Sequence, residues 1–243
     1  MPLPHAVPLT SFFKARLSPE GYLGLHLTVG AVILLVAVAI FGNIAVDLAP
    51  PGHMVALDLQ VSRWFYLHVS PWLTWFFRLI SGLHGTVGVL CLAGLFASVL
   101  TRKRSWTWLC LLALSVPLGM LLNVLLKNIF QRARPSFEQP LLTLATYSFP
   151  SGHVAAATLL YGVLGAYLLS RSQGGWRVLI VLGAFAMVLL VGLSRMYLGV
   201  HYLSDVVAAV VSSTGWLAIT FSAVATWRKR QTAQQPTDSS SKP

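Results

Sequence analysis

A polar run from Ser194 to Asp205 lies between two long apolar segments and holds the residues best suited to chemistry. His201 and Asp205 are four positions apart, so a helix that begins near His201 would place both side chains on one face. The carboxylate would then hold the imidazole in one tautomer, which makes His201 an oriented nucleophile or base. For this stretch alone, an ordinary buried ion pair at a membrane boundary is the alternative.

Three cations accompany the ends of the apolar segments. Arg195 belongs to the polar run itself, and Lys127 and Arg134 lie in an earlier polar stretch. The arginine side chain is a planar fork that fits the oxygens of a phosphate or carboxylate, whereas lysine acts as a point charge. Together these side chains could surround an anion.

A third polar stretch ends in Ser151, Gly152 and His153, directly before another apolar segment. Ser151 is suited to cap the start of a helix, and Gly152 would allow a ligand to approach closely. The free N–H groups and the dipole of such a helix start favour phosphate. One shared anion site is the economical explanation for all three stretches.

The composition excludes a soluble domain. The 243 residues are 56% hydrophobic and 9% charged, against a charged fraction of about 25% in soluble domains. The net charge of +11 comes mostly from basic residues at the ends of apolar segments, which favours topology signals and lipid headgroups over nucleic acid. Cys91 and Cys110 lie in apolar runs without metal-ligand spacing. The sequence therefore predicts an integral membrane protein without a cofactor, a metal or a nucleic-acid partner.

The apolar segments predict an all-α bundle of six transmembrane helices, because each is close to the roughly 20 residues that cross a bilayer. They cover approximately residues 25–46, 83–100, 106–126, 154–169, 178–193 and 201–227. Between the first and second spans, residues 55–80 mix aromatic rings with basic side chains. This mixture predicts an interfacial segment in the headgroup region, and a loop whose aromatic rings pack on the bundle is the alternative.

The basic residues divide unequally between the two sides of this bundle, eleven on the side of the termini and six on the other. The positive-inside rule then places both termini in the cytoplasm. Residues 1–24 are expected to be a cytoplasmic segment, 25–227 the six-span domain, and 228–243 a disordered polar tail. All three polar stretches would share the periplasmic or extracellular face of the cell (inner) membrane.

Three motifs occur in a fixed order along the chain. They read Lys127-x6-Arg134-Pro135, then Pro150-Ser151-Gly152-His153, then Ser194-Arg195-x5-His201-x3-Asp205. In these motifs, their spacing and the six-span layout, the chain resembles the phosphatidic acid phosphatase type 2 family of membrane lipid phosphatases. Soluble vanadium haloperoxidases share related motifs, but six apolar spans argue against that branch.

The resemblance implies a role for each signature residue. His201 would attack phosphorus and form a phosphohistidine while Asp205 orients it, and His153 would protonate the leaving oxygen and then activate water. Arg132 fits either the phosphate site or a headgroup contact. The substrate phosphate would be held by Lys127, Arg134, Ser151, Gly152 and Arg195. Structural or interfacial positions are expected for the remaining histidines, His5, His26, His53, His68 and His84.

The expected activity is metal-independent hydrolysis of a lipid phosphate or diphosphate that reaches the site sideways from the outer leaflet. A phosphotransferase that passes phosphate to another lipid, such as lipid A, is the second reading. A non-enzymatic lipid transporter or scaffold is the third, and the intact catalytic set argues against it. Undecaprenyl diphosphate, phosphatidylglycerophosphate, phosphatidate and lipid A are not separated by the sequence, because they differ in parts remote from the phosphate. The oligomeric state is likewise not predicted.

Overall fold

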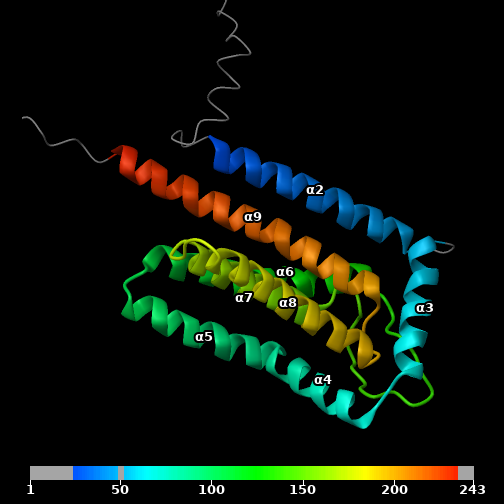
Figure 1. Cartoon of the computed structure of the whole chain (residues 1–243). Coiled ribbons are helices and arrows are strands. Elements are labelled where there is room, and N and C mark those ends of the chain that lie inside the picture. Colours follow the sequence, from blue (N-terminus) through cyan, green and yellow to red (C-terminus); the bar gives the residue numbers. More distant parts are fainter. Residues whose placement is uncertain (1–23, 49–51, 235–243) are drawn as a thin grey trace, which may run out of the picture.

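The computed structural model describes residues 24–48 and 52–234, which form helices joined by loops (Figure 1). The helices are α2 (Leu25–Asp47), α3 (His53–Leu67), α4 (Pro71–Leu83), α5 (Thr86–Arg102), α6 (Trp106–Phe130), α7 (Gly152–Leu169), α8 (Trp176–Tyr197) and α9 (Leu203–Gln234). Five of them are long and apolar enough to cross a membrane, and the count is six if α4 and α5, which are bent by 56° at their junction, cross as one span. The predicted all-α membrane fold is confirmed. The predicted N-terminal segment lies outside the described residues except for Gly24.

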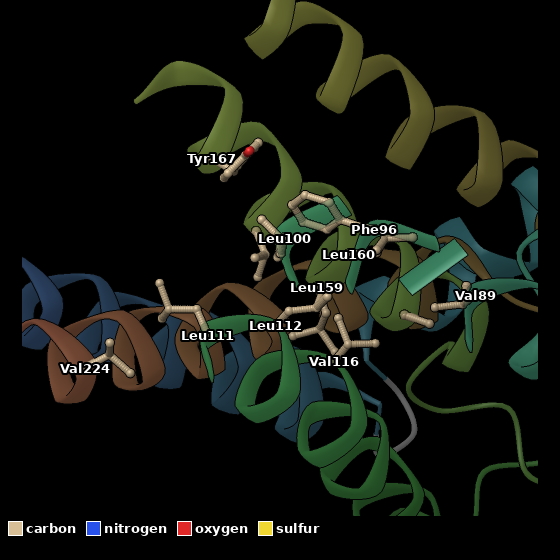
Figure 2. Packing of buried hydrophobic residues seen from close by; sticks show 12 residues of the cluster. Val89, Phe96, Leu100, Leu111, Leu112, Val116, Leu159, Leu160, Tyr167 and Val224 are labelled. Atoms are coloured by element: carbon tan, nitrogen blue, oxygen red, sulfur yellow. The ribbon is translucent and has the colours of Figure 1, made fainter. Parts of the chain in front are cut away.

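Helix α7 forms the centre of the bundle and packs against α5, α6, α8 and α9. Its first half is almost entirely buried, and three successive alanines, Ala155 to Ala157, let neighbouring helices approach closely. Leu159 and Leu160 pack with Val116 of α6 in the main apolar cluster (Figure 2). The packed core therefore reaches one end of α7, where the polar stretches lie.

The outer helices enclose this centre. Helices α2 and α9 run side by side along one flank, and α3 crosses one end of the bundle beside the start of α9 (Figure 1). Large apolar side chains on α2 and α8, such as Leu35 and Phe185, stay exposed. Exposed apolar side chains are what a helix surface facing lipid requires.

The predicted interfacial segment 55–80 is divided in the structure. Helix α3 ends at Leu67, and α4 begins after Ser70, whose hydroxyl accepts a hydrogen bond from the Leu73 N–H at 3.4 Å. Helix α4 ends at Leu83 and α5 begins at Thr86 beyond the bend, so the span predicted for 83–100 corresponds to α5, with α4 directly before it. The bend brings Leu83 so close to Gly88 that an added Cβ would lie 2.2 Å from the Leu83 carbonyl oxygen. Only glycine fits there.

The last helix is longer than expected. Helix α9 continues to Gln234, so residues 228–234 are helical where a disordered tail was predicted. Arginine, lysine, alanine and glutamine are good helix formers, and neither glycine nor proline interrupts them before Pro236. The rest of the predicted tail, residues 235–243, lies outside the described residues.

Candidate active site

The three polar stretches meet at one end of the bundle. Lys127 lies in the last turn of α6, His153 at the start of α7 and Arg195 in the last turn of α8. A cavity of about 400 Å³ is lined by six of the predicted site residues, Lys127, Arg134, Gly152, His153, Arg195 and His201. Three segments that are separate in the sequence, at 127–134, 152–153 and 195–201, therefore form one site.

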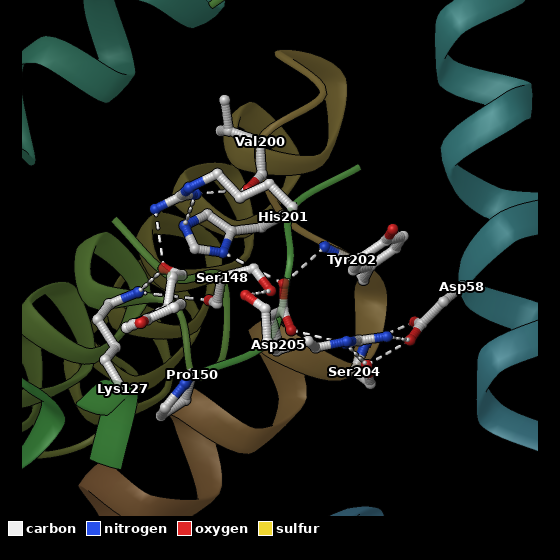
Figure 3. Close-up of polar contacts among 12 residues, drawn as sticks. Asp58, Lys127, Ser148, Pro150, Val200, His201, Tyr202, Ser204 and Asp205 are labelled. Atoms are coloured by element: carbon white, nitrogen blue, oxygen red, sulfur yellow. Dashed lines mark hydrogen bonds and ion pairs between the residues drawn. The ribbon is translucent and has the colours of Figure 1, made fainter. Parts of the chain in front are cut away.

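His201 is buried directly before α9 rather than inside it. Its Nδ1 lies 3.3 Å from the Oδ2 of Asp205, and that same oxygen accepts the Tyr202 N–H at 2.9 Å (Figure 3). Helix α9 begins at Leu203, two residues after the approximate start predicted at His201, so His201 itself lies outside the helix. Asp205 is the third helical residue, and it bonds back to the backbone ahead of the helix as the acidic member of a capping box does. Helix capping thus turns the carboxylate toward His201.

The tautomer of His201 follows from its two neighbours. With Nδ1 facing the carboxylate as a donor, Nε2 is left as an acceptor, and Arg134 Nη1 lies 3.2 Å from it. Burial lowers the pKa of His201 from 6.5 to about 4, although the hydrogen bond and charge of Asp205 act in the opposite direction. At neutral pH the imidazole is uncharged and keeps a lone pair on Nε2.

A turn with a glycine places His201. Gly199 has a φ of +70°, and a Cβ there would also lie 3.2 Å from the Phe137 ring. A left-handed residue is needed because the chain reverses between α8 and α9. The turn leaves the backbone oxygen of Val200 free to accept a bond from Arg134 Nη1 at 2.6 Å.

Arg134 and Lys127 are held by neutral oxygens of the loop that connects α6 to α7. The Arg134 guanidinium donates to the carbonyl of Thr146 at 2.6 Å, and the Lys127 ammonium to that of Tyr147 at 2.7 Å. Burial lowers the pKa of Arg134, an effect that the charge of Asp205 opposes. Neither cation forms an ion pair among the described residues, so their positive charge is available to a bound anion.

Arg195 is 1% exposed and contacts one polar side chain among the described residues. Its Nη1 donates to the hydroxyl of Ser81 on α4, whereas Nε and Nη2 have no partner among the described residues. Leaving a buried polar group unpaired costs about 1–3 kcal/mol. Two unpaired donors on one buried guanidinium are expected where a ligand completes the hydrogen bonding.

The start of α7 carries a further unpaired group. Ser151 occupies the predicted N-cap position, but its hydroxyl makes no capping bond and has no partner among the described residues. A Cβ on Gly152 would lie 3.3 Å from Asn123 Oδ1 and 3.7 Å from Lys127 Cε, so the Asn123 side chain would have to shift slightly to accept a larger residue. His153 follows, facing the bend at Gly85.

Arg132 binds two carboxylates and is not among the residues that line the cavity. Its Nη1 donates to Asp205 Oδ1 and its Nη2 to Asp58 Oδ2, both at 2.7 Å, and its guanidinium stacks over the ring of Tyr202. Burial alone would lower the pKa of Arg132, but the charges and hydrogen bonds of Asp205 and Asp58 raise it above its ordinary value. With two carboxylates in its reach, this side chain turns away from the cavity.

Sequence reasoning missed Asp58 and Ser81, and it expected a structural or interfacial position for His84 without placing it beside the cavity. Both ring nitrogens of His84 lie within hydrogen-bond distance of a partner, at 2.8 Å from the Ile80 carbonyl oxygen and from the Tyr161 hydroxyl. His84 also lines the cavity. Asp58 could have been noticed as one of only six acidic residues, placed in an apolar and aromatic segment. Serine is too common for Ser81 to give any signal.

Fold and site together define a class, the polytopic membrane enzymes that bind an anion between helix ends beside a carboxylate-oriented histidine. Comparison with known proteins gives the family. The profile of the PAP2 superfamily matches residues 108–229, which is half of the chain. The chain belongs to this superfamily, and it is a membrane lipid phosphatase, a hydrolase.

Relatives agree in sequence and in structure. Phosphatidylglycerophosphatase B of Bacillus subtilis (strain 168) is 34% identical over 154 residues, which are 61% of this chain and 74% of that protein. The crystal structure of the transmembrane PAP2-type phosphatidylglycerolphosphate phosphatase from Bacillus subtilis superposes with a TM-score of 0.68 at 26% identity, covering 84% of this chain and 98% of that one. The crystal structure of Aquifex aeolicus LpxE gives a TM-score of 0.55 at 26% identity, covering 68% and 94%.

Proposed function

We propose that this protein removes the phosphate of a membrane lipid, with phosphatidylglycerophosphate as the first substrate to test, through a phosphohistidine on His201. One observation carries the proposal: His201, whose Nε2 is the unprotonated ring nitrogen, lines a cavity whose cations contact only neutral partners in the described part of the chain. The names of the relatives from Bacillus subtilis support the choice of substrate.

In the first step, His201 Nε2 attacks phosphorus and the bond from phosphorus to the lipid oxygen breaks. His153 gives a proton to the leaving oxygen, which departs as the lipid alcohol. Asp205 accepts the Nδ1–H bond and stabilises the imidazolium that forms. Lys127, Arg134 and Arg195 balance the charge on the equatorial oxygens.

In the second step, water attacks the phosphohistidine. His153 takes the proton of this water, the N–P bond breaks, and its electron pair returns to Nε2. The products are inorganic phosphate and the lipid alcohol, and both histidines regain their starting protonation. Ser151 and the backbone N–H groups that open α7 hold the phosphate oxygens through both steps.

The substrate reaches this site from the lipid side. The cavity is lined by Leu121 and Val124 of α6, which are 55% and 50% exposed, and by Thr86 of α5. The apolar tail of a lipid can lie against Leu121 and Val124 while the phosphate of the same lipid stays between the helix ends. The basic turns at Arg102–Arg104 and Arg171–Arg177 connect the opposite ends of the helices (Figure 1), which supports a periplasmic or extracellular site with both termini cytoplasmic.

The experiment uses the purified protein in detergent with phosphatidylglycerophosphate labelled in the terminal phosphate. We expect release of inorganic phosphate, also in the presence of EDTA, and an acid-labile, base-stable label on the protein after rapid quenching. His201→Ala should abolish both, whereas His53→Ala, a change of an exposed histidine outside the cavity, should retain both. Transfer of the label to a second lipid without free phosphate would instead identify a phosphotransferase.

A further inference from the structure

Asp58 is a fully buried carboxylate on α3, outside the three signature motifs. A buried charge is costly unless it is paired and hydrogen-bonded. Helix α3 contributes only one other buried residue, Ser62, so Asp58 is not there as part of an apolar core. Its contacts must account for its presence.

Both oxygens of Asp58 point at the start of α9 and at Arg132 (Figure 3). Oδ1 accepts the Ser204 N–H at 2.9 Å, and Oδ2 accepts the Ser204 hydroxyl at 2.5 Å and Arg132 Nη2 at 2.7 Å. Ser204 directly precedes Asp205. The carboxylate therefore fixes the backbone next to the partner of His201.

Arg132 continues the chain of contacts to the dyad of His201 and Asp205. Its Nη1 donates to Asp205 Oδ1 at 2.7 Å and to the Ser204 hydroxyl at 2.7 Å. The other oxygen, Oδ2, is then the one that faces His201 and the Tyr202 N–H. The fork of Arg132 thus spans two carboxylates and assigns each oxygen of Asp205 a different partner.

We propose that Asp58 and Arg132 are positioning residues that fix the carboxylate of Asp205, and through it the ring of His201, for attack on the substrate phosphorus. This inference rests on the proposed function. Asp58 also engages one end of the Arg132 fork, which prevents the guanidinium from turning its whole charge on Asp205. Misplacement of a reacting group by about 1 Å can cost about 100-fold in rate, so distant residues of this kind control kcat.

The two residues are separate from the phosphate-binding cations. Lys127, Arg134 and Arg195 have their own partners on the α6–α7 loop, on Val200 and on Ser81. A change at Asp58 should therefore reduce the rate of attack and leave the affinity for phosphate intact. A general loosening of the protein would alter both, and this difference separates positioning from a merely structural role.

The test compares Asp58→Asn with the wild type in three measurements: kcat and KM for the lipid, the inhibition constant of inorganic phosphate, and the rate of phosphohistidine formation. Asparagine keeps the size of the side chain, but its NH2 group cannot accept from Arg132. We expect kcat and phosphohistidine formation to fall about 10- to 100-fold, with KM and the inhibition constant changed less than about twofold.

Asp47→Asn is the matched control. Asp47 holds the start of α3, since its carboxylate oxygens accept the N–H groups of His53 at 3.3 Å and Met54 at 2.6 Å, and it does not line the cavity. This variant also removes hydrogen bonds that hold α3, and it should keep the wild-type kcat. Equal losses of kcat in Asp47→Asn and Asp58→Asn would overturn the inference.

Arg132→Lys and a double variant complete the design. Lysine keeps the charge but lacks the planar fork, so Arg132→Lys should reproduce the fall in kcat with an unchanged inhibition constant, even if Asp58→Asn does not accumulate. The double variant Asp58→Asn/Arg132→Gln should lose less than about twofold beyond Arg132→Gln alone, because both act on one carboxylate. A wild-type kcat in both Asp58→Asn and Arg132→Lys overturns the positioning role. Absence of phosphohistidine in the wild type overturns the proposed function itself.

Discussion

Arg195 on α8 donates a hydrogen bond to Ser81 on α4, 114 positions away in the sequence. Ser81 is 6% exposed and is the only buried residue of α4, so the fully buried contact that this helix contributes is a polar one. The hydroxyl engages Nη1 of the guanidinium, and Nε and Nη2 have no partner within residues 24–48 and 52–234. Ser81 thereby orients the fork so that its free edge is available to an anion.

Ser81→Ala should weaken phosphate binding without removing catalysis. The loss of one hydrogen bond to a charged group costs about 1.5–3 kcal/mol, so KM for the lipid and the inhibition constant of phosphate should both rise by about tenfold or more. Steady-state kinetics in detergent measure both. Ser98→Ala changes an exposed serine of α5 and should leave them unaltered. Unchanged phosphate inhibition in Ser81→Ala would show that Arg195 needs no orientation.

Substitutions in the dyad should separate the two chemical steps. His201→Ala is expected to abolish turnover and covalent labelling, and Asp205→Asn to reduce kcat by a factor on the order of 10⁴, as for other carboxylates that fix a catalytic histidine. His153→Ala should slow hydrolysis and leave the inhibition constant of phosphate largely unchanged. Quenched-flow labelling and phosphate inhibition distinguish these outcomes. Normal turnover in His201→Ala would exclude it as the nucleophile.

Local patterns in the sequence predict much of this molecule. The apolar segments indicate the spans because lipid requires long apolar helices, and the motifs indicate Lys127, His153 and Arg195 because each lies at a span end. The spacing of His201 and Asp205 predicts their contact, although for the wrong reason. The two residues meet through the capping geometry at the start of α9, not on one helix face.

Contacts between distant segments could not be predicted in this way. Asp58 meets Ser204 across 146 positions, and the choice of Arg132 between the cavity and the carboxylates depends on where α3 crosses the bundle. Helix packing decides these partners, and no spacing in the sequence records it. The bend between α4 and α5 could not be predicted from the sequence either, because the aromatic residues before it are typical both of an interfacial segment and of the outer end of a span.

Burial of neutral His201 should make stability depend on acid. Its pKa is about 4 in the folded protein and 6.5 as the ordinary value, so the unfolded chain binds a proton first as the pH falls. This group therefore costs no stability above pH 6.5, and the folded state loses stability between pH 6.5 and about 4, by up to roughly 3 kcal/mol. Thermal unfolding of the wild type and of His201→Gln over this range measures the difference. Equal pH dependence of both Tm values would contradict a buried neutral imidazole.

The topology can be tested with single cysteines in a background without Cys91 and Cys110. Both termini and Lys103 should be cytoplasmic, and residues 136–146 should face the periplasm or the exterior, because the basic residues divide eleven to six. A membrane-impermeant thiol reagent in intact cells should modify Thr143→Cys and spare Ser240→Cys, a position outside the described residues. Labelling of Ser240→Cys alone would reverse the orientation.

Lateral access predicts that a change on the lipid face of α6 affects long substrates selectively. Leu121 lines the cavity and is 55% exposed, so Leu121→Trp should narrow the passage beside Thr86 and lower kcat/KM for a long-chain lipid phosphate about tenfold. A short, water-soluble phosphate ester does not need this passage and should lose less than about twofold. Tail burial gains little, because the bilayer that the lipid leaves is equally apolar, so headgroup and passage shape should dominate selectivity.

The matched control for lateral access is Leu35→Trp, which adds the same bulk to an exposed position of α2 away from the cavity. Both substrates should be turned over normally by this variant in mixed micelles. In the wild type, the long-chain lipid should have a higher kcat/KM than the short ester, since only the lipid is presented at the depth of the helix ends. Equal kcat/KM for the two substrates, together with equal losses in Leu121→Trp, would mean that the phosphate enters from water.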